Sequence, residues 1–99
     1  MIYHVLTTAD WQKALQQGFY APPSLALEGF IHTSKQTQVK GVLERYYKHQ
    51  SELLLLHIDE NKLTAKLTYD MVAVENETFP HIYGPLNLDA IIKVAVIEE

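Results

Sequence analysis

Short apolar stretches and amphipathic segments with capping residues follow one another along this 99-residue chain. The first stretch, Ile2 to Leu6, is rich in residues that favour strands, and it begins almost at the N-terminus. Thr7 or Thr8 is expected to cap a helix that ends near Gly18, because threonine suits the start of a helix and glycine its end. The apolar stripe of this helix has i, i+3, i+4 spacing and consists of Trp11, Ala14 and Leu15.

One more turn of helix and a strand are expected next. Two prolines precede Ser24, which is the predicted cap of a helical turn from Leu25 to Glu28. Gly29 is the predicted end of that turn. The following residues, Phe30 to Thr33, are rich in side chains that favour a strand.

The strongest helical pattern of the chain covers residues 35 to 49, with Ser34 as its expected cap. Its apolar positions follow i, i+3, i+4, i+7 and i+8 spacing and are Val39, Val42, Leu43, Tyr46 and Tyr47. Gly41 costs such a helix roughly 1 kcal/mol relative to alanine, and a close backbone contact would explain its presence.

Strands dominate the second half. Leu53 to Ile58 is apolar on both faces, as expected of a central strand that is covered on both sides. Further strands are predicted over Leu67 to Val74, Phe79 to Tyr83 and Ile91 to Ile97. Helices in the first half and strands in the second favour an α+β fold, a compact single domain over residues 1–99 with a mostly antiparallel sheet and two main helices.

Composition narrows the class of protein. Hydrophobic residues make up 47% of the chain and cysteine is absent, so a globular core is expected and thiol chemistry is excluded. The net charge of −4 disfavours binding to a nucleic-acid backbone. No apolar run reaches the ~20 residues of a membrane span, and the N-terminus lacks the basic region of a signal peptide, so we expect a cytoplasmic protein.

Histidines stand in three predicted strands that are otherwise mostly apolar. Because side chains i and i+2 of a strand share a face, His32 lies with Phe30 and Ser34. By the same rule His81 lies with Phe79 and Tyr83. A buried polar group costs free energy unless it is paired or solvated. We therefore predict that His4, His32, Ser34, His81 and Tyr83 converge on one cleft.

Other interpretations of these residues stay open. A strand histidine is more often structural than catalytic, and Tyr83-Gly84-Pro85 fits a simple turn. Three histidines can also hold zinc, but neither an HxH nor an HExxH spacing is present, so no metal is predicted. Motifs for a dinucleotide-binding glycine loop, a Walker A loop or a serine nucleophile elbow are absent as well.

The longer motifs resemble a known family. The segments IYHVLT from Ile2, EGFIHTS from Glu28 and FPHIYGPL from Phe79 follow the order seen in the bacterial domain-of-unknown-function family 952. This resemblance covers nearly the whole chain. It implies a fold like that of the ADP-ribosyltransferases, a split α+β sheet with a nicotinamide dinucleotide (NAD) cleft between its halves.

Within that superfamily the local similarity is to the RNA 2′-phosphotransferases. Tyr3-His4 is similar to a Tyr-His pair on their first strand, and Ile31-His32-Thr33-Ser34 is similar to a Val-His-x-Ser motif. The resemblance implies that His4 contacts the adenosine side of NAD, and that His32 and Ser34 line the nicotinamide or phosphate region. His81 and Tyr83 are candidates through the family motif alone.

Two departures affect the expected activity. The glutamate that most ADP-ribosyltransferases carry on a late strand has no clear counterpart; Glu77 is the best candidate, with Glu75 and Asp70 behind it. Arg45 is the single arginine, so the phosphate-binding arginines of the phosphotransferases are not evident. Lost or altered chemistry is consistent with both departures.

Three functional classes remain in view. The first is group transfer on an NAD-like ligand, with His32, His81 and Glu77 as catalytic residues and His4, His32, Ser34 and Tyr83 as binding residues. The second is a non-catalytic ligand-binding or regulatory module that keeps the cleft. The third is a protein-interaction domain that uses exposed aromatic residues, among them Tyr20, Tyr46 and Tyr47. The oligomeric state is not predicted.

Overall fold

The computed structural model describes residues 1–98 and begins with the expected strand and helix. Strand β1 covers Ile2–Thr7 and helix α1 covers Thr8–Gln17. Thr7 is the cap, because its Oγ1 accepts a hydrogen bond from the backbone N–H of Asp10 at 3.1 Å. The helix ends at Gly18, whose φ of 86° is left-handed and therefore favours glycine.

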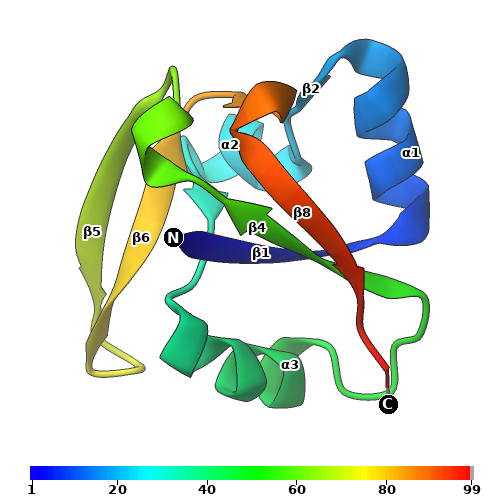
Figure 1. The fold of residues 1–99 in the computed structure, drawn as a ribbon. Helices are drawn as coiled ribbons and strands as arrows, with labels where there is room; N and C mark the ends of the chain where they lie inside the picture. Colours follow the sequence, from blue (N-terminus) through cyan, green and yellow to red (C-terminus); the bar gives the residue numbers. More distant parts are fainter. Residues whose placement is uncertain (99) are drawn as a thin grey trace.

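A three-stranded antiparallel sheet has β4 at its centre. β4 covers Leu53–Ile58 and lies between β1 and β8, which covers Ile91–Val96. The prediction of a central strand here is confirmed. Leu56 and Ile58 are fully buried, and in the register Leu56 faces His4 across the β1–β4 pair. Figure 1 shows these three strands in the middle of the molecule.

A second three-stranded sheet carries two of the histidine motifs. Its order is β3 (Ile31–His32), β6 (Glu77–Tyr83) and β5 (Lys66–Val72), again antiparallel. Two short strands, β2 (Phe19–Tyr20) and β7 (Leu86–Asn87), pair separately. The fold is thus α+β with antiparallel sheets and few helices, as the sequence predicts. The β5–β6 pair lies to one side of the central strands and α1 to the other (Figure 1).

A single bridge connects β1 to the chain after β3. The backbone groups of Tyr3 and Ser34 exchange two hydrogen bonds of 2.8 Å each. Because β1 and β3 belong to different sheets, this bridge brings the Tyr3-His4 strand next to the His32 strand. It therefore fixes the relative positions of the histidines.

The helix starts differ from the sequence predictions at both serines. Helix α2 covers Pro23–Glu28, and Pro22 occupies the cap position before it. Ser24 therefore lies inside the helix and is not its cap. Ser34 is not a cap either: the cap position of the turn that follows is Lys35, and the backbone of Ser34 forms the bridge to Tyr3. A 3-10 turn over Gln36–Gln38 comes next, and helix α3 covers only Val39–Tyr46, shorter than the predicted residues 35 to 49.

The core joins both sheets and α1. Its fully buried side chains come from β1, β3, β4, β6 and β7, and they include Ile2, Ile31, Leu56, Ile58, Ile82 and Leu86. Ala14 is the buried residue of α1, while Leu15 of the predicted apolar stripe is half exposed. Two further 3-10 turns, Glu60–Lys62 and Leu88–Ala90, close the ends of the central strands. No helix among residues 1–98 is long and apolar enough to cross a membrane.

Candidate functional site

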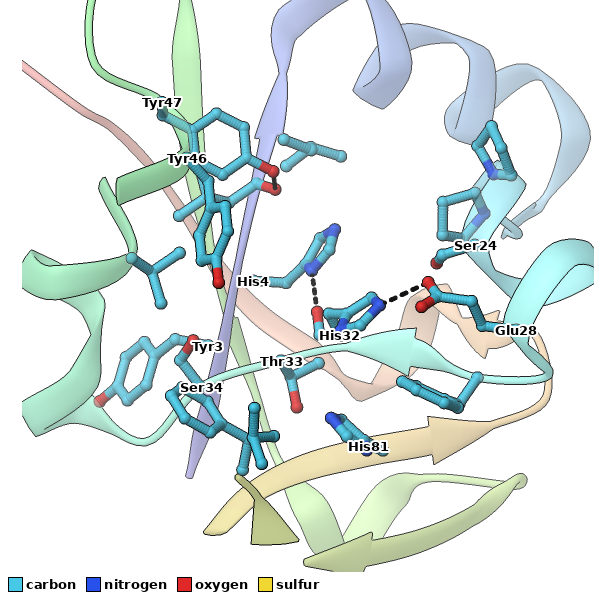
Figure 2. A pocket seen from close by; sticks show the side chains of 18 of the residues that line it. Tyr3, His4, Ser24, Glu28, His32, Thr33, Ser34, Tyr46, Tyr47 and His81 are labelled. Carbon is cyan, nitrogen blue, oxygen red and sulfur yellow. Dashed lines mark hydrogen bonds and ion pairs between the residues drawn. The ribbon is translucent and has the colours of Figure 1, made fainter. Parts of the chain in front are cut away.

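A cleft of about 800 Å³ opens between the two sheets and the helices α2 and α3. Side chains of β1 form its middle, those of β3 and β6 one wall, and those of α3 the other. Figure 2 shows Tyr46 of α3 and Tyr47 just after it at one end, Ser24 and Glu28 of α2 at the opposite end, and His4 between them. The volume lies within the ~300–1,000 Å³ of small-molecule sites.

His4 has hydrogen bonds at both ring nitrogens. Nδ1 lies 2.6 Å from the carbonyl oxygen of His32, and Nε2 lies 2.8 Å from the hydroxyl of Tyr20. Burial lowers the pKa of His4 from 6.5 to about 4, against the opposing effect of the His32 carbonyl. The imidazole is therefore neutral at pH 7. Because a carbonyl only accepts, Nδ1–H is the donor, and Nε2 accepts the hydrogen bond from Tyr20.

His32 forms an exposed pair with a carboxylate of α2. Its Nε2 lies 2.7 Å from Glu28 Oε2, and both side chains are about half exposed on the cleft wall. Since the carboxylate is the acceptor, Nε2–H donates. Nδ1 of His32 has no hydrogen-bond partner within the described chain, so it is available to a ligand.

His81 forms a second, more buried carboxylate pair. Its Nδ1 donates to Asp70 Oδ2 at 2.9 Å across the β5–β6 pair, and its side chain is only 6% exposed. The hydroxyl of Tyr83 donates to the same oxygen. The hydrogen bond from Tyr83 lowers the pKa of Asp70 most, and the bond from His81 lowers it further. The same bond to Asp70 raises the pKa of Tyr83.

Nε2 of His81 points to the open side of the pair. It has no partner in the part of the chain that the structure describes, yet no fully buried side-chain nitrogen or oxygen of that part lacks one. Nε2 is therefore not fully enclosed, and His81 is one of the residues that line the cleft.

The two paired histidines are neighbours. His32 and His81 face each other in the β3–β6 register, and their ring centroids are 5.4 Å apart. Phe30 stacks on His81 at 4.1 Å with an interplanar angle of 18°, and it also contacts His32 edge-on. The aromatic ring thereby fixes both imidazoles, each of which keeps one nitrogen free of protein partners.

The wall formed by α3 is aromatic. Tyr47 lies against β1, where its hydroxyl donates to the carbonyl oxygen of Val5 at 3.3 Å. Tyr46 is 60% exposed, and its hydroxyl donates to Glu75 Oε2 at 3.2 Å. The same carboxylate oxygen binds Arg45 Nε at 2.6 Å. Arg45 packs against Gly41, where a Cβ would lie 2.8 Å from the guanidinium; the expected close backbone contact is not found, and the end of the arginine side chain can move aside.

The predicted site residues fall into two groups. His4, His32, Ser34 and His81 all line the cleft. Glu77 does not: it is exposed at the start of β6 and accepts a hydrogen bond from Gln38 Nε2 at 3.3 Å. Tyr83 is also outside the lining and acts on the site through Asp70.

Sequence reasoning missed the role of Glu28 and ranked Asp70 behind Glu77. The four-residue spacing of Glu28 and His32 is no helical signal, because Gly29 ends α2 between them and the contact depends on how α2 turns back onto β3. The Asp70–His81 contact depends on the β5–β6 register, which the sequence does not reveal. The expectation of an exposed Tyr20 was wrong, because Tyr20 is only 6% exposed and bonds His4.

Metal binding is not indicated. Among residues 1–98 no group of three or more histidine, aspartate or glutamate side chains is arranged to hold a metal ion. The carboxylates near the histidines instead orient the rings through hydrogen bonds. The arrangement suits proton transfer to and from a bound molecule.

Comparison with known families agrees with the motifs. A family model described as a protein of unknown function, DUF952, matches residues 5–94. The chain belongs to the DUF952 family. No curated protein shows significant similarity to it.

Solved structures of one relative share the DUF952 fold of this chain. The crystal structure of protein CC0527 from Caulobacter crescentus has a TM-score of 0.89 at 28% identity and covers 98% of this chain and 85% of its own. The crystal structure of a double mutant of the same protein has a TM-score of 0.89 at 26% identity, with the same coverage of both chains. The solution NMR structure of CC0527 has a TM-score of 0.83 at 28% identity and covers 98% of this chain and 84% of its own.

Proposed function

We propose that this DUF952 protein binds a nucleoside- or nucleotide-sized molecule in its histidine cleft and transfers a group from it by acid–base catalysis. The observation that carries the proposal is the pair of carboxylate-bound imidazoles, His32 and His81, with ring centroids 5.4 Å apart. Histidine is the side chain whose ordinary pKa suits proton transfer near neutral pH.

The geometry suggests a role for each imidazole. In the neutral state His81 donates Nδ1–H to Asp70, so its Nε2 is a base that faces the cleft. His32 donates Nε2–H to Glu28, so its Nδ1 is the free nitrogen. One ring can take the proton of an attacking hydroxyl while the other, when protonated, supplies a proton to a leaving group. His4 lacks this capacity at pH 7 and instead positions the His32 strand.

The resemblance to ADP-ribosyltransferases supplies the first ligands to test. In a transfer from NAD, or from its phosphate-free fragment nicotinamide riboside, the glycosidic C–N bond breaks and nicotinamide leaves as a neutral molecule. An acceptor hydroxyl forms the new C–O bond and gives its proton to the base. His4, His32 and Ser34 are the residues through which the resemblance extends to this cleft.

Nicotinamide release tests the proposal. The protein is incubated with NAD and with nicotinamide riboside, and free nicotinamide is followed by proton NMR. Because nicotinamide leaves without needing a proton, we expect release to fall about 100-fold or more in His81→Ala, which removes the base, and to fall less in His32→Ala, which removes a contact to the bound molecule. His49→Ala is the matched control, because His49 is exposed and does not line the cleft. Release that is equal in all four proteins would contradict the proposal.

A non-catalytic ligand-binding role is the second candidate. The structural observation in its favour is that none of the described residues that line the cleft is lysine or arginine, the residues that usually stabilise transferred phosphate. Ligand-induced NMR shifts in the cleft without any turnover would identify this role. An aromatic docking surface has less support, because Tyr20 and Tyr47 are turned inward and only Tyr46 is largely exposed.

A further inference from the structure

The charged groups that line the cleft are of one sign. Asp10, Glu28 and Glu75 contribute carboxylates, and no lysine or arginine side chain of residues 1–98 joins them. Arg45 offsets Glu75 through its 2.6 Å ion pair and His32 lies 2.7 Å from Glu28, but Asp10 has no ion pair within the described chain. A phosphate or carboxylate group on a ligand would therefore meet these carboxylates with no lysine or arginine of the lining to bind it.

The uncharged polar groups include acceptors. When neutral, His32 and His81 each present an unprotonated nitrogen to the cleft. Neither nitrogen has a partner among the described residues, so each can accept a hydrogen bond from a molecule in the cleft.

Four hydroxyls of the lining donate inside the protein. Tyr20 donates to His4, Tyr47 to the carbonyl oxygen of Val5, and Thr33 to the carbonyl oxygen of Pro80 at 2.6 Å. Tyr46 donates to Glu75. The hydroxyls of Tyr3, Ser24 and Ser34 donate to no described residue, so the cleft offers a ligand these donors beside the imidazole acceptors.

The walls favour a flat occupant. One wall carries Phe30 and Phe79 beside the two imidazoles, and the facing wall carries the exposed ring of Tyr46. Figure 2 shows Tyr46 and the His32–His81 wall on either side of His4. Aromatic side chains on both sides provide faces for stacking against a planar ligand.

We propose that the ligand is an uncharged or cationic planar molecule that carries N–H or O–H donors and has no phosphate or carboxylate group. The inference rests on the proposed function, since it concerns the ligand of the same cleft. It narrows that ligand: the pyrophosphate of NAD is disfavoured, and a nucleoside or a cationic heteroaromatic ring is favoured.

Three molecules of nearly identical shape test the charge preference. Benzamidine is cationic, benzamide is neutral and benzoate is anionic, and all three are planar. Each is titrated into the isotope-labelled protein while amide and imidazole NMR signals are followed. We expect benzamidine to bind at least about tenfold more tightly than benzoate, with benzamide between them. The carboxylates of the cleft attract the positive charge of benzamidine and repel the negative charge of benzoate. Adenosine should likewise bind more tightly than its 5′-monophosphate.

A carboxylate variant locates the effect. Glu28→Gln keeps the size of the side chain and removes one negative charge from the cleft, so it should reduce the benzamidine preference several-fold. Glu77→Gln is the matched control outside the lining and should leave the preference unchanged. Tighter binding of benzoate or of the monophosphate would overturn the charge preference while leaving the proposed function in place. An absence of cleft shifts with every compound would overturn both.

Discussion

The half-buried, neutral imidazole of His4 makes a specific prediction about stability and pH. In the folded protein its pKa is about 4, while an unfolded chain has the ordinary value of 6.5. Between these two values the unfolded state binds more protons than the folded state, so acidification favours unfolding. Stability from His4 is complete above pH 6.5 and is lost as the pH falls towards 4.

The magnitude follows from the two pKa values. At pH 5 the unfolded imidazole is almost fully protonated and the folded one almost fully neutral. Proton linkage then removes about 2 kcal/mol of unfolding free energy between pH 8 and pH 5. This loss is a large fraction of the ~5–15 kcal/mol that stabilises a typical domain.

Urea unfolding at several pH values measures this loss. His4→Gln cannot take up a proton, so its unfolding free energy should be lower than wild type at pH 8 but should change much less between pH 8 and pH 5. His49→Gln, at an exposed position outside the cleft, should retain the wild-type profile. If the wild type and His4→Gln lose the same free energy over this range, the argument from His4 burial is wrong.

Three further substitutions test individual contacts. Tyr20→Phe removes the donor to His4 Nε2 and should cost about 1–2 kcal/mol in urea unfolding, whereas an unchanged stability would show that this bond contributes nothing. Asp70→Asn removes the negative charge that accepts the hydrogen bond of Tyr83, so the raised pKa of Tyr83 should fall towards its ordinary value of about 10. An ultraviolet titration measures this pKa, and an unchanged value would exclude Asp70 as the cause of the shift. Gly18→Ala should cost about 1 kcal/mol through backbone strain alone, because a Cβ there meets no atom within 4 Å, and a neutral substitution would contradict the left-handed helix end.

Local patterns predicted the strands and the first helix well. Thr7, Gly18 and the apolar run Leu53 to Ile58 have the roles that capping and burial rules give them. The start of α3 could not be predicted in the same way. Ser34 has the chemistry of a cap, but a long-range bridge to Tyr3 takes its backbone, and the helix begins later, after a 3-10 turn.

The candidate site was predicted in part for a related reason. The two-residue period of a strand placed His32 and His81 with the correct neighbours on their own strands. The orienting carboxylates depend on tertiary structure: Asp70 reaches His81 only through the β5–β6 register, and Glu28 reaches His32 only because α2 turns back onto β3. Glu77 has a suitable place in the sequence, but its side chain lies outside the cleft.

The most direct test of the central claim is whether one small molecule perturbs both paired histidines. Imidazole and amide NMR signals of the labelled protein are recorded with a set of nucleosides and planar amidines at millimolar concentration. The account predicts joint shifts of His32, His81 and Phe30, lost in His81→Ala and retained in His49→Ala, with both variants folded. Shifts confined to residues outside the cleft, or none with any compound, would contradict it.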